Sequence, residues 1–433
     1  MKHLGFMEKL LDGVEVEWKP IGEVFELKNG YTPSKANTDY WTNGVIPWFR
    51  MEDIRANGRV LRTAIQSVSA SAVKGKLIPA NSLMMSTTAT LGEHALIEVP
   101  FITNQQITSF TISNAYDGKI NVKFMFHCFF EYGKWCAENA NKNGGMGIIG
   151  LSKLKQFMIP IPCPENPVKS LKIQSEIVRI LDNFTELTTK LTAELTAELT
   201  ARKKQYHYYR DHLLSFEEGG VDRFPMGQPE IGEFIRGGGL QKKDFTEKGV
   251  GCIHYGQIYT HYGSYADRTK TYVSEDFFKK ARKAKTGDLV IATTSENDED
   301  VCKAVAWLGR DEIAVSSDAC IYRHKLNPKY VSYFFQTEQF QKQKRQHITG
   351  TKVRRVNADD LAKILIPTPS LAEQARIVAI LDKFEALTNS ITEGLPREIA
   401  LRRQQYEYYR DLLLSFPKPA PETPLESAEQ QHG

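Results

Sequence analysis

The sequence predicts an α+β protein in which an antiparallel pair of long helices separates two β-rich blocks, with a pseudo-twofold internal repeat. Three observations predict it. Residues 177–216 and 377–416 are about half identical at a constant offset of 200, without a gap. Both copies carry apolar residues at helical spacing. The two remaining stretches open and close on similar motifs, although their middles differ. Such self-similarity indicates one structural unit built twice.

Each repeated stretch is predicted to form a long amphipathic helix. The helically spaced apolar residues are Ile177, Ile180, Leu181, Phe184, Leu187, Leu191, Leu195 and Leu199 in the first copy, and Ile377, Ile380, Leu381, Phe384, Leu387 and Ile391 in the second. From Leu187 to Leu199 a leucine recurs at every fourth residue, which predicts a narrow seam for a partner helix. Two similar helices in one chain are expected to pack antiparallel. The run Gly394-Leu395-Pro396 is expected to kink or interrupt the second helix.

The chain is predicted to divide into six segments. They are residues 1–20, a short helix and strand that complete a circular repeat; 21–164, the first β-rich block; 165–216, the first helical spacer; 217–370, the second β-rich block; 371–416, the second helical spacer; and 417–433, a Pro-rich tail expected to be disordered. Each block opens on an Ile-Gly-Glu strand, at Ile21 and at Ile231. Each block closes on an Ile-Pro-x-Pro exit, at Ile159 and at Ile366.

Composition limits the class of protein. A chain of 433 residues with 41% hydrophobic residues is long enough for two folded domains. The net charge of +4 is mild, so a nucleic-acid role has to rest on local clusters of charge. Six cysteines without a CxxC pair suit reduced thiols in a cytoplasm. The sequence has neither a signal peptide nor an apolar run of spanning length, and we expect a protein without membrane contact.

The duplicated motifs resemble those of one family. Two variable blocks, each opening on Ile-Gly-Glu, closing on Ile-Pro-x-Pro and followed by a helix such as QSEIVRILD, look like the specificity (S) subunit of a type I restriction-modification enzyme. The resemblance implies two target-recognition domains that each read one half of a bipartite site in double-stranded DNA. It also implies two methyltransferase (M) subunits, which use S-adenosylmethionine to methylate adenine, and two restriction (R) subunits, which hydrolyse ATP with Mg and cut. Neither chemistry belongs to the S subunit.

The sequence lacks the motifs that either of these chemistries would require. The sequence contains no GxxxxGK[ST] motif for ATP phosphates and no Asn-Pro-Pro-Tyr motif of adenine methyltransferases. One GxGxxG match, Gly145 to Gly150, follows polar residues where a dinucleotide site requires a buried strand, so we interpret it as a loop. The acidic run Glu296 to Asp300 is interpreted as a solvated loop tip, because consecutive carboxylates in a loop point apart and do not converge on a metal.

The second block carries the stronger DNA-binding pattern. Between Phe340 and Ala358 there are six cations and no acidic residue, interleaved with glutamines and threonines; the cations are Lys342, Lys344, Arg345, Lys352, Arg354 and Arg355. Cations neutralise phosphates, while arginine and glutamine can pair with base edges. The alternative is a solvated basic helix. Further candidates for base contact are His254, Tyr255, Gln257 and Arg268, with a structural role as the alternative for His254.

The first block offers a different set of candidates. Four arginines recur after Pro47-Trp48-Phe49, at Arg50, Arg55, Arg59 and Arg62. Small hydroxyl groups lie in a loop that repeats between the blocks, where they could contact phosphates: Thr87, Thr88 and Thr90 in the first block, Thr293 and Thr294 in the second. The segment from Asn139 to Lys153 lacks the basic cluster of the second block, so the first block is expected to read DNA with other loops.

A repeated aromatic motif lies at the end of each helix. Its members are Tyr206, Tyr208, Tyr209 and Arg210 in the first copy, and Tyr406, Tyr408, Tyr409 and Arg410 in the second. Aromatic residues at helical spacing usually belong to a core. The alternative is a docking face, present once per half, for the two methyltransferase subunits.

Two other classes of protein remain as alternatives. A solitary DNA-binding regulator is disfavoured because the sequence shows no helix-turn-helix and has large duplicated β-rich blocks. A fused nuclease or methyltransferase is disfavoured by the missing motifs. The purified chain alone separates these classes, because a regulator binds its site unaided, an enzyme turns over, and an S subunit does neither well without its methyltransferase partner.

Overall fold

The computed structural model describes residues 10–11, 13–142, 145–216, 220–389 and 393–418. These residues fall into two compact units: unit 1 comprises residues 1–192 and 401–433, and unit 2 comprises residues 193–400. Each unit therefore contains one β-rich block together with stretches of the repeated helices. Most of the predicted N-terminal helix, Ile391 and nearly all of the predicted disordered tail lie outside the described residues.

Unit 1 is built on a five-stranded sheet of order β2-β9-β6-β7-β4 and a three-stranded sheet of order β5-β3-β8. Its strands are β1 (Val16–Pro20), β2 (Phe25–Asn29), β3 (Ile46–Phe49), β4 (Val60–Leu61), β5 (Ser67–Val68), β6 (Ser82–Ser86), β7 (His94–Ile97), β8 (Ile102–Thr103), β9 (Ile107–Ile112) and β10 (Met158–Pro162). Its short helices are α2 (Ile21–Val24), α3 (Met51–Asn57), α4 (Val122–Asn139), α5 (Leu151–Leu154), η1 (Thr38–Tyr40), η2 (Ala70–Ala72) and η3 (Asn114–Tyr116). Strand β1 pairs antiparallel with β10 at the entry and exit of the block.

Unit 2 repeats the five-stranded sheet, with the order β12-β21-β17-β19-β14, and its second sheet has four strands, in the order β15-β13-β20-β16. Its strands are β11 (Arg223–Pro225), β12 (Gly232–Arg236), β13 (Val250–Ile253), β14 (Tyr265–Ala266), β15 (Thr271–Val273), β16 (Lys283–Ala284), β17 (Leu289–Ala292), β18 (Thr294–Ser295), β19 (Ala304–Trp307), β20 (Ile313–Val315), β21 (Ala319–His324), β22 (Arg354–Arg355) and β23 (Leu365–Pro367). Its short helices are η4 (Lys242–Asp244), α7 (Tyr255–Thr260), α8 (Glu275–Lys280), α9 (Pro328–Phe334), α10 (Glu338–Arg345) and α11 (Ala358–Leu361). In both units the last strand of the large sheet is parallel to its neighbour.

One opening motif differs from its sequence prediction. In unit 2 the Ile-Gly-Glu motif leads into strand β12, as predicted. In unit 1 the same motif forms the single helical turn α2, and the strand begins only at Phe25. Ile21 is fully buried there and its N–H donates to the carbonyl of Phe157. This hydrogen bond continues the pairing of β1 with β10 past Pro20 and Met158, so Ile21 is held at the exit strand before the chain turns through α2.

The repeated stretches form long helices, as predicted. Helix α6 (Pro167–Ser215) is continuous over 49 residues, whereas the second copy is divided into α12 (Leu371–Asn389) and α13 (Gly394–Leu413). The predicted interruption therefore exists, although Gly394 and Pro396 lie in the first turn of α13, where proline is tolerated. Gly394 has a φ of 76°, and a Cβ there would lie 2.5 Å from the Ala386 carbonyl oxygen.

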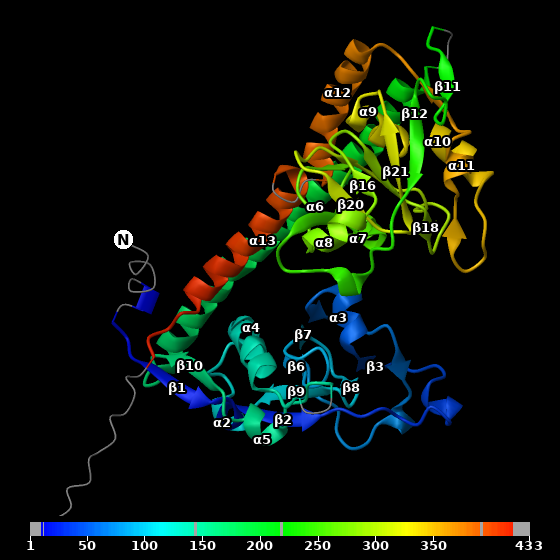
Figure 1. Ribbon diagram of the computed structural model, residues 1–433. Coiled ribbons are helices and arrows are strands. Elements are labelled where there is room, and N and C mark those ends of the chain that lie inside the picture. The colour runs from blue at the N-terminus through cyan, green and yellow to red at the C-terminus, as the bar shows by residue number, and fades with distance from the viewer. Residues whose placement is uncertain (1–9, 12, 143–144, 217–219, 390–392, 419–433) are drawn as a thin grey trace, which may run out of the picture. The chain divides into compact units, whose positions relative to one another are not determined.

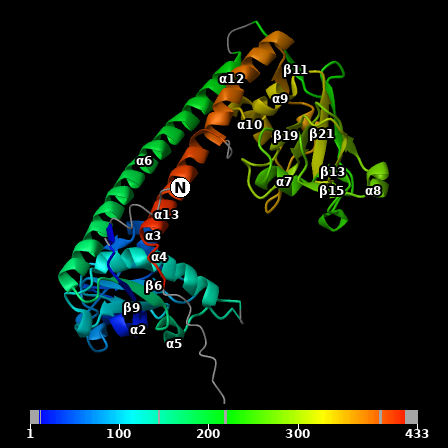
Figure 2. The ribbon, with the colours of Figure 1, turned by 90° about the vertical axis from the view of Figure 1, so that its left-hand side faces the viewer.

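Within each unit, α6 runs beside a stretch of the second helical copy (Figure 1, Figure 2). In unit 1 the Phe184 ring stacks on Tyr409 at 5.5 Å, and Thr185 hydrogen-bonds Tyr406 at 2.9 Å. Residue numbers rise along α6 as they fall along α13, so the pair is antiparallel, as predicted. The leucine seam is only partly correct, because Leu187 is 62% exposed while Leu191, Leu195 and Leu199 are partly buried.

A polar joint connects the helices to each β-rich block in the same way. The Gln174 Oε1 on α6 accepts the backbone N–H of Asn121 at 2.8 Å, and Asn121 caps α4. In unit 2 the Gln374 Oε1 on α12 accepts the N–H of Asn327, also at 2.8 Å, and Asn327 caps α9. Both glutamines are almost completely buried. Because a buried N–H without a partner is costly, each glutamine holds the start of a block helix against the long helix.

An ion pair accompanies each glutamine. Lys123 lies 3.2 Å from Asp182 in unit 1, and Lys329 lies 2.7 Å from Asp382 in unit 2. The other side chain that contacts this aspartate differs between the units. His127 contacts Asp182 at 3.3 Å, whereas Tyr333 donates to Asp382 and Glu385 at 2.6 and 2.7 Å. The joint is thus conserved in geometry between the two units and different in chemistry.

Acidification is expected to weaken unit 1 through His94. This histidine lies on β7, is 1% exposed and packs against the rings of Phe126 and Phe129. Burial, with the nearby Arg59 charge, lowers its pKa from 6.5 to about 3. Below pH 6.5 His94 is therefore protonated in the unfolded chain but stays neutral in the folded unit. The free energy of unfolding falls by ~1.4 kcal/mol per pH unit as the pH drops from 6.5 to about 3.

Urea unfolding at pH 7 and pH 5 tests this dependence. The wild-type chain is expected to lose about 2 kcal/mol from unit 1 over that interval through His94 alone. The His94→Gln variant starts less stable, because it disturbs a buried site, and it is expected to lose correspondingly less on acidification. An equal loss in the variant and the wild type would assign the acid sensitivity to other groups.

Candidate nucleic-acid interface

Arg50 and His254 occupy equivalent junctions in the two units. Arg50 follows β3, which runs parallel to β8, and His254 follows β13, which runs parallel to β20. Each residue caps the helix that follows, and its backbone N–H is bound by a side chain three residues on: Asp53 at 2.7 Å and Gln257 at 3.1 Å. Arg50 and His254 therefore occupy the same strand-to-helix junction of the repeated fold.

The surroundings of these two residues differ. The Arg50 guanidinium lies 4.9 Å over the Trp48 ring and pairs with Glu52 at 2.8 Å. His254 is 9% exposed, and its Nδ1 accepts the Gly256 N–H at 3.2 Å. Burial and the Lys242 charge lower the pKa of His254, so the imidazole stays neutral at physiological pH. Arg268, also predicted to contact bases, is exposed.

Two of the predicted base readers around His254 are engaged within unit 2. Gln257 accepts the His254 N–H and donates to Thr271 Oγ1 at 3.0 Å, so both ends of its amide are bound. Gln257 therefore supports the junction, and its contact with a base stays a prediction. Tyr255 is partly buried, packs against a hydrophobic cluster of unit 2 with its ring 4.7 Å from that of His254, and donates its backbone N–H to Ser316 Oγ at 2.8 Å.

The other arginines of unit 1 are divided between structural and exposed positions. Arg59 donates to the His94 carbonyl at 2.9 Å and lies 5.2 Å over the Phe130 ring, and burial lowers its pKa. These contacts make Arg59 a packing residue, contrary to the prediction. Arg62 is 78% exposed and pairs with Glu98 at 2.6 Å. Arg55 is exposed on α3 and remains open to a ligand.

The repeated threonine loops form the same structure in both units. Thr88 pairs with Ile148 in unit 1, and Thr294 pairs with Arg355 in unit 2. Thr87 is 6% exposed and bonds Thr108 Oγ1 at 3.2 Å, so the prediction that Thr87 meets phosphate is wrong. Thr294 is also buried, at 8%. Thr88, Thr90 and Thr293 are partly buried.

This loop pairing also accounts for the GxGxxG match. The Ile149 N–H donates to Thr87 O in unit 1, and the Val356 N–H donates to Thr293 O in unit 2. The segment from Gly145 to Gly150 therefore takes the place of the basic loop of unit 2 and follows helix α4, not a buried strand. Its interpretation as a loop is confirmed. Where unit 2 presents Arg355, unit 1 presents Ile148, which is 53% exposed.

The predicted basic segment of unit 2 divides into a buried and an exposed part. Lys344 is fully buried, and its Nζ donates to the carbonyls of Asp298, Glu299 and Val301 at 2.8, 3.1 and 3.0 Å. All three of its protons are used, so the prediction that Lys344 meets DNA is wrong. Burial lowers its pKa. Residues Glu296 to Asp300 are all exposed, which confirms the interpretation of the acidic run as a solvated loop tip, and Asp298 pairs there with Arg354 at 2.8 Å.

The remaining cations form the exposed part. Lys342, Lys352 and Arg355 are exposed and have no ion pair within the described residues, and Arg345 is exposed but pairs with Glu338 at 3.0 Å. Strand β18 joins this part to α7, because Tyr259 Oη donates to Thr294 O at 2.8 Å. Across the described ranges, no group of three or more His, Cys, Asp or Glu side chains could hold a metal ion.

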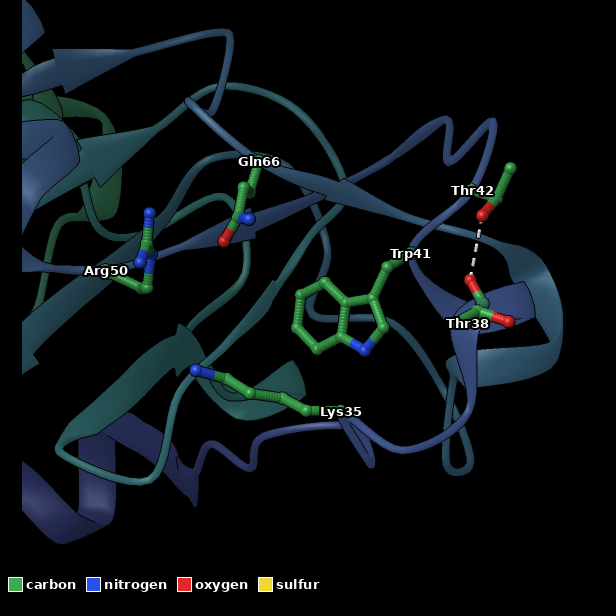
Figure 3. A pocket seen from close by; sticks show the side chains of 6 residues that line it. All are labelled: Lys35, Thr38, Trp41, Thr42, Arg50 and Gln66. Carbon is green, nitrogen blue, oxygen red and sulfur yellow. Dashed lines mark hydrogen bonds between the residues drawn. The ribbon is translucent and has the colours of Figure 1, made fainter.

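A polar pocket opens beside Arg50 in unit 1. It has a volume of about 430 Å³ and is lined by Lys35, Thr38, Trp41, Thr42, Arg50 and Gln66 (Figure 3). Only Arg50 was identified from the sequence. The other five come from two loops that meet only in the fold, and no spacing in the chain relates Lys35 to Gln66. The two tryptophans close in sequence, Trp41 before β3 and Trp48 within it, are the one local sign of a built site.

The repeated tyrosine motif is partly core and partly surface. Tyr206, Arg210 and Arg410 are between 3% and 6% exposed. The second tyrosine of each copy is exposed: Tyr208 by 64% and Tyr408 by 55%. Tyr209 and Tyr409 stack on the facing helices, at 5.5 Å from Phe384 and Phe184 respectively. Tyr406 is partly buried. The core interpretation therefore holds for the packed members, whereas Tyr208 and Tyr408 lie on the surface.

Comparisons with known proteins agree with this architecture. The family model "Type I restriction modification DNA specificity domain" matches residues 13–201 and again residues 226–401. The EcoprrI specificity subunit of a type I restriction enzyme from Escherichia coli is 41% identical over 395 residues, which cover 91% of this chain and 93% of that protein. The EcoR124I/EcoR124II specificity subunit, also from E. coli, is 35% identical over 426 residues, covering 97% and 99%.

Solved structures share the fold. A chain from a study of complex assembly and conformational transition of the type I R-M system has a TM-score of 0.66 at 14% identity, covering 93% of this chain and 98% of that one. The HsdS subunit from Thermoanaerobacter tengcongensis has a TM-score of 0.50 at 14% identity, covering 92% and 96%. Within the described residues, none of the helices has the length and apolar character to cross a membrane. With the family model matched twice and relatives alike over almost their whole length, the chain belongs to the family of type I restriction-modification specificity subunits.

Proposed function

We propose that each unit reads one half of a bipartite site in double-stranded DNA, while the long helices set the length of the unspecified spacer. The observation that carries this proposal is one fold built twice with different side chains at equivalent positions. Arg50 corresponds to His254, and Ile148 corresponds to Arg355. A scaffold repeated with its surface changed is suited to two readers of different sequence.

The exposed cations of unit 2 would hold the DNA backbone. Lys342, Lys352 and Arg355 lie on α10, the following loop and β22, where no carboxylate of the described residues pairs with them. Such cations supply salt-dependent affinity without sequence preference. Base selection would then come from the junction residues and the loops beside them.

The chain would act without chemistry of its own. S-adenosylmethionine would be bound by two methyltransferase subunits, and ATP and Mg by two restriction subunits. In this arrangement the chain chooses the site and its partners methylate adenine or cut. A solitary regulator is the second candidate, and it would bind its site without any partner.

Co-expression with a cognate methyltransferase subunit tests the proposal. Single-molecule sequencing for N6-methyladenine is expected to show one bipartite motif, with adenine methylated in each half and a fixed gap. Absence of methylation from a complex verified as assembled would contradict the proposal. Site-specific binding by the chain alone would favour the regulator.

Loss of the exposed tyrosines is expected to weaken assembly with the methyltransferase subunits. Tyr208 and Tyr408 are exposed in both repeats, and exposed tyrosines are enriched in interfaces. Replacing both with alanine should lower the affinity at least tenfold, measured by titration of purified subunits. Tyr272→Ala, a change of another partly exposed tyrosine on β15, is the matched control. Unchanged affinity in the double variant would remove these residues from the interface.

A further inference from the structure

The pocket beside Arg50 presents three polar groups to one space. In Figure 3 the ends of Lys35, Arg50 and Gln66 converge beside the ring of Trp41. The Lys35 amine has no ion pair, and the Gln66 amide makes no hydrogen bond, within the described residues. Arg50 gives Nη1 to Glu52, and its buried Nε lacks a hydrogen-bond partner in the same part of the chain. The pocket therefore offers unused donors from Lys35 and Gln66, beside an Arg50 guanidinium that is already bound to Glu52 through Nη1.

The aromatic wall of the pocket is held in place. The Trp41 Nε1 donates to the Ser34 carbonyl at 3.0 Å, and its ring meets Trp48 edge-on at 5.0 Å. Trp48 is 3% exposed and donates its own Nε1 to the Tyr31 carbonyl at 3.2 Å. Because both indole N–H groups are satisfied by the protein, Trp41 offers the pocket a fixed apolar surface and no competing donor.

The chemistry of this lining matches DNA. A guanidinium or an amide can pair with the edge of a purine, an ammonium group neutralises a phosphate, and an apolar ring packs against a base or sugar. The six lining residues include two cations and no carboxylate, although Glu52 outside the lining already pairs with Arg50. A small neutral metabolite would leave Lys35 without a counter-charge, whereas a nucleotide of a duplex supplies both a base edge and a phosphate.

Unit 2 places an aromatic residue and a polar side chain at the positions equivalent to Trp41 and Arg50. The 3-10 helices η1 and η4 each end just before an aromatic residue, Trp41 and Phe245. In unit 2 the Phe245 ring meets His254 edge-on at 5.9 Å, at the junction equivalent to Arg50. At this position unit 1 has the guanidinium of Arg50 near an indole ring, and unit 2 has the imidazole of His254 near the phenyl ring of Phe245. A position that is fixed in the fold and varied in chemistry is expected where two different sequences are read.

Resting on the proposed function, we propose that this pocket is a base-reading position of unit 1, in which Arg50 and Gln66 bind the edge of a purine while Lys35 binds a phosphate. Trp41 limits how deeply the base edge enters. Arg50 and Gln66 are therefore specificity residues, and Lys35 contributes affinity without sequence preference.

Mapping of N6-methyladenine in the assembled complex tests the assignment. Gln66→Ala is the first variant, because Gln66 is exposed and its truncation leaves the fold intact. Arg50→His, which installs the residue of the equivalent junction, is the second. Each is expected to relax or change one base position in one half-site, with a loss of discrimination of roughly tenfold to hundredfold, while the other half and the spacer stay the same.

Lys35→Ala is expected to slow methylation at all sites without changing the motif, and to flatten the dependence of DNA binding on salt. Lys76→Ala removes a positive charge from an exposed position of the same unit outside the pocket lining and is the matched control. A motif that is unchanged in both Gln66→Ala and Arg50→His, in complexes that assemble normally, overturns the assignment. Absence of methylation by the wild-type complex would instead reject the proposed function itself.

Discussion

Deletion of Thr192–Leu195 is expected to shorten the unspecified spacer of the recognised site by about one to two base pairs and to leave both half-sites unchanged. These four residues are one tetrad of helix α6, which is continuous from Pro167 to Ser215. At 1.5 Å per residue the deletion removes about 6 Å of helix. The leucine period of four is kept, so Leu191 and Leu199 remain available to the same seam.

Methylation-site mapping of the deletion variant provides the measurement. The substitution Glu194→Gln, at an exposed position inside the same tetrad, keeps the helix length and is expected to keep the spacer. Duplication of the tetrad should lengthen the spacer by the same amount. A spacer that stays constant in the deletion variant would show that the length of α6 does not set it.

Removal of the buried glutamines is expected to destabilise the two units separately. Gln174→Ala leaves the Asn121 N–H without its partner and opens a cavity beside α4. Gln374→Ala does the same to Asn327 and α9. An unpaired buried donor together with a cavity costs about 2–4 kcal/mol. The effect should be confined to the unit that carries the change, because each bond lies within one unit.

Hydrogen exchange followed by mass spectrometry separates the two effects. Amide protection in α4 is expected to fall in Gln174→Ala, and protection in α9 is expected to fall in Gln374→Ala, each without the other. Gln346→Ala, at an exposed position after α10, should leave both helices protected. Equal protection in all three variants would mean that apolar packing alone holds the blocks to the helices.

The features that the sequence determined by itself are those repeated or periodic along the chain. The two copies at an offset of 200 and their apolar spacing predicted the fold class correctly, and the duplicated opening and exit motifs carried the family resemblance. The run from Gly394 to Pro396 predicted the break in the second helix. Periodicity has this power because a helix brings residues three and four apart to one face whatever lies around it. The six segment limits and the individual DNA contacts stay predictions.

The tertiary structure alone decided which polar side chains are available to a ligand. Lys344 lies in a run of cations yet binds three carbonyls, and Gln257 and Thr87 are likewise satisfied inside the fold. Conversely, no sequence pattern marked Lys35 or Gln66 as a binding residue, yet both line one pocket. Whether a charge faces water or a buried carbonyl depends on partners distant in sequence, and burial makes such a bond obligatory. Local composition records the charge of a segment but not the contacts that neutralise it.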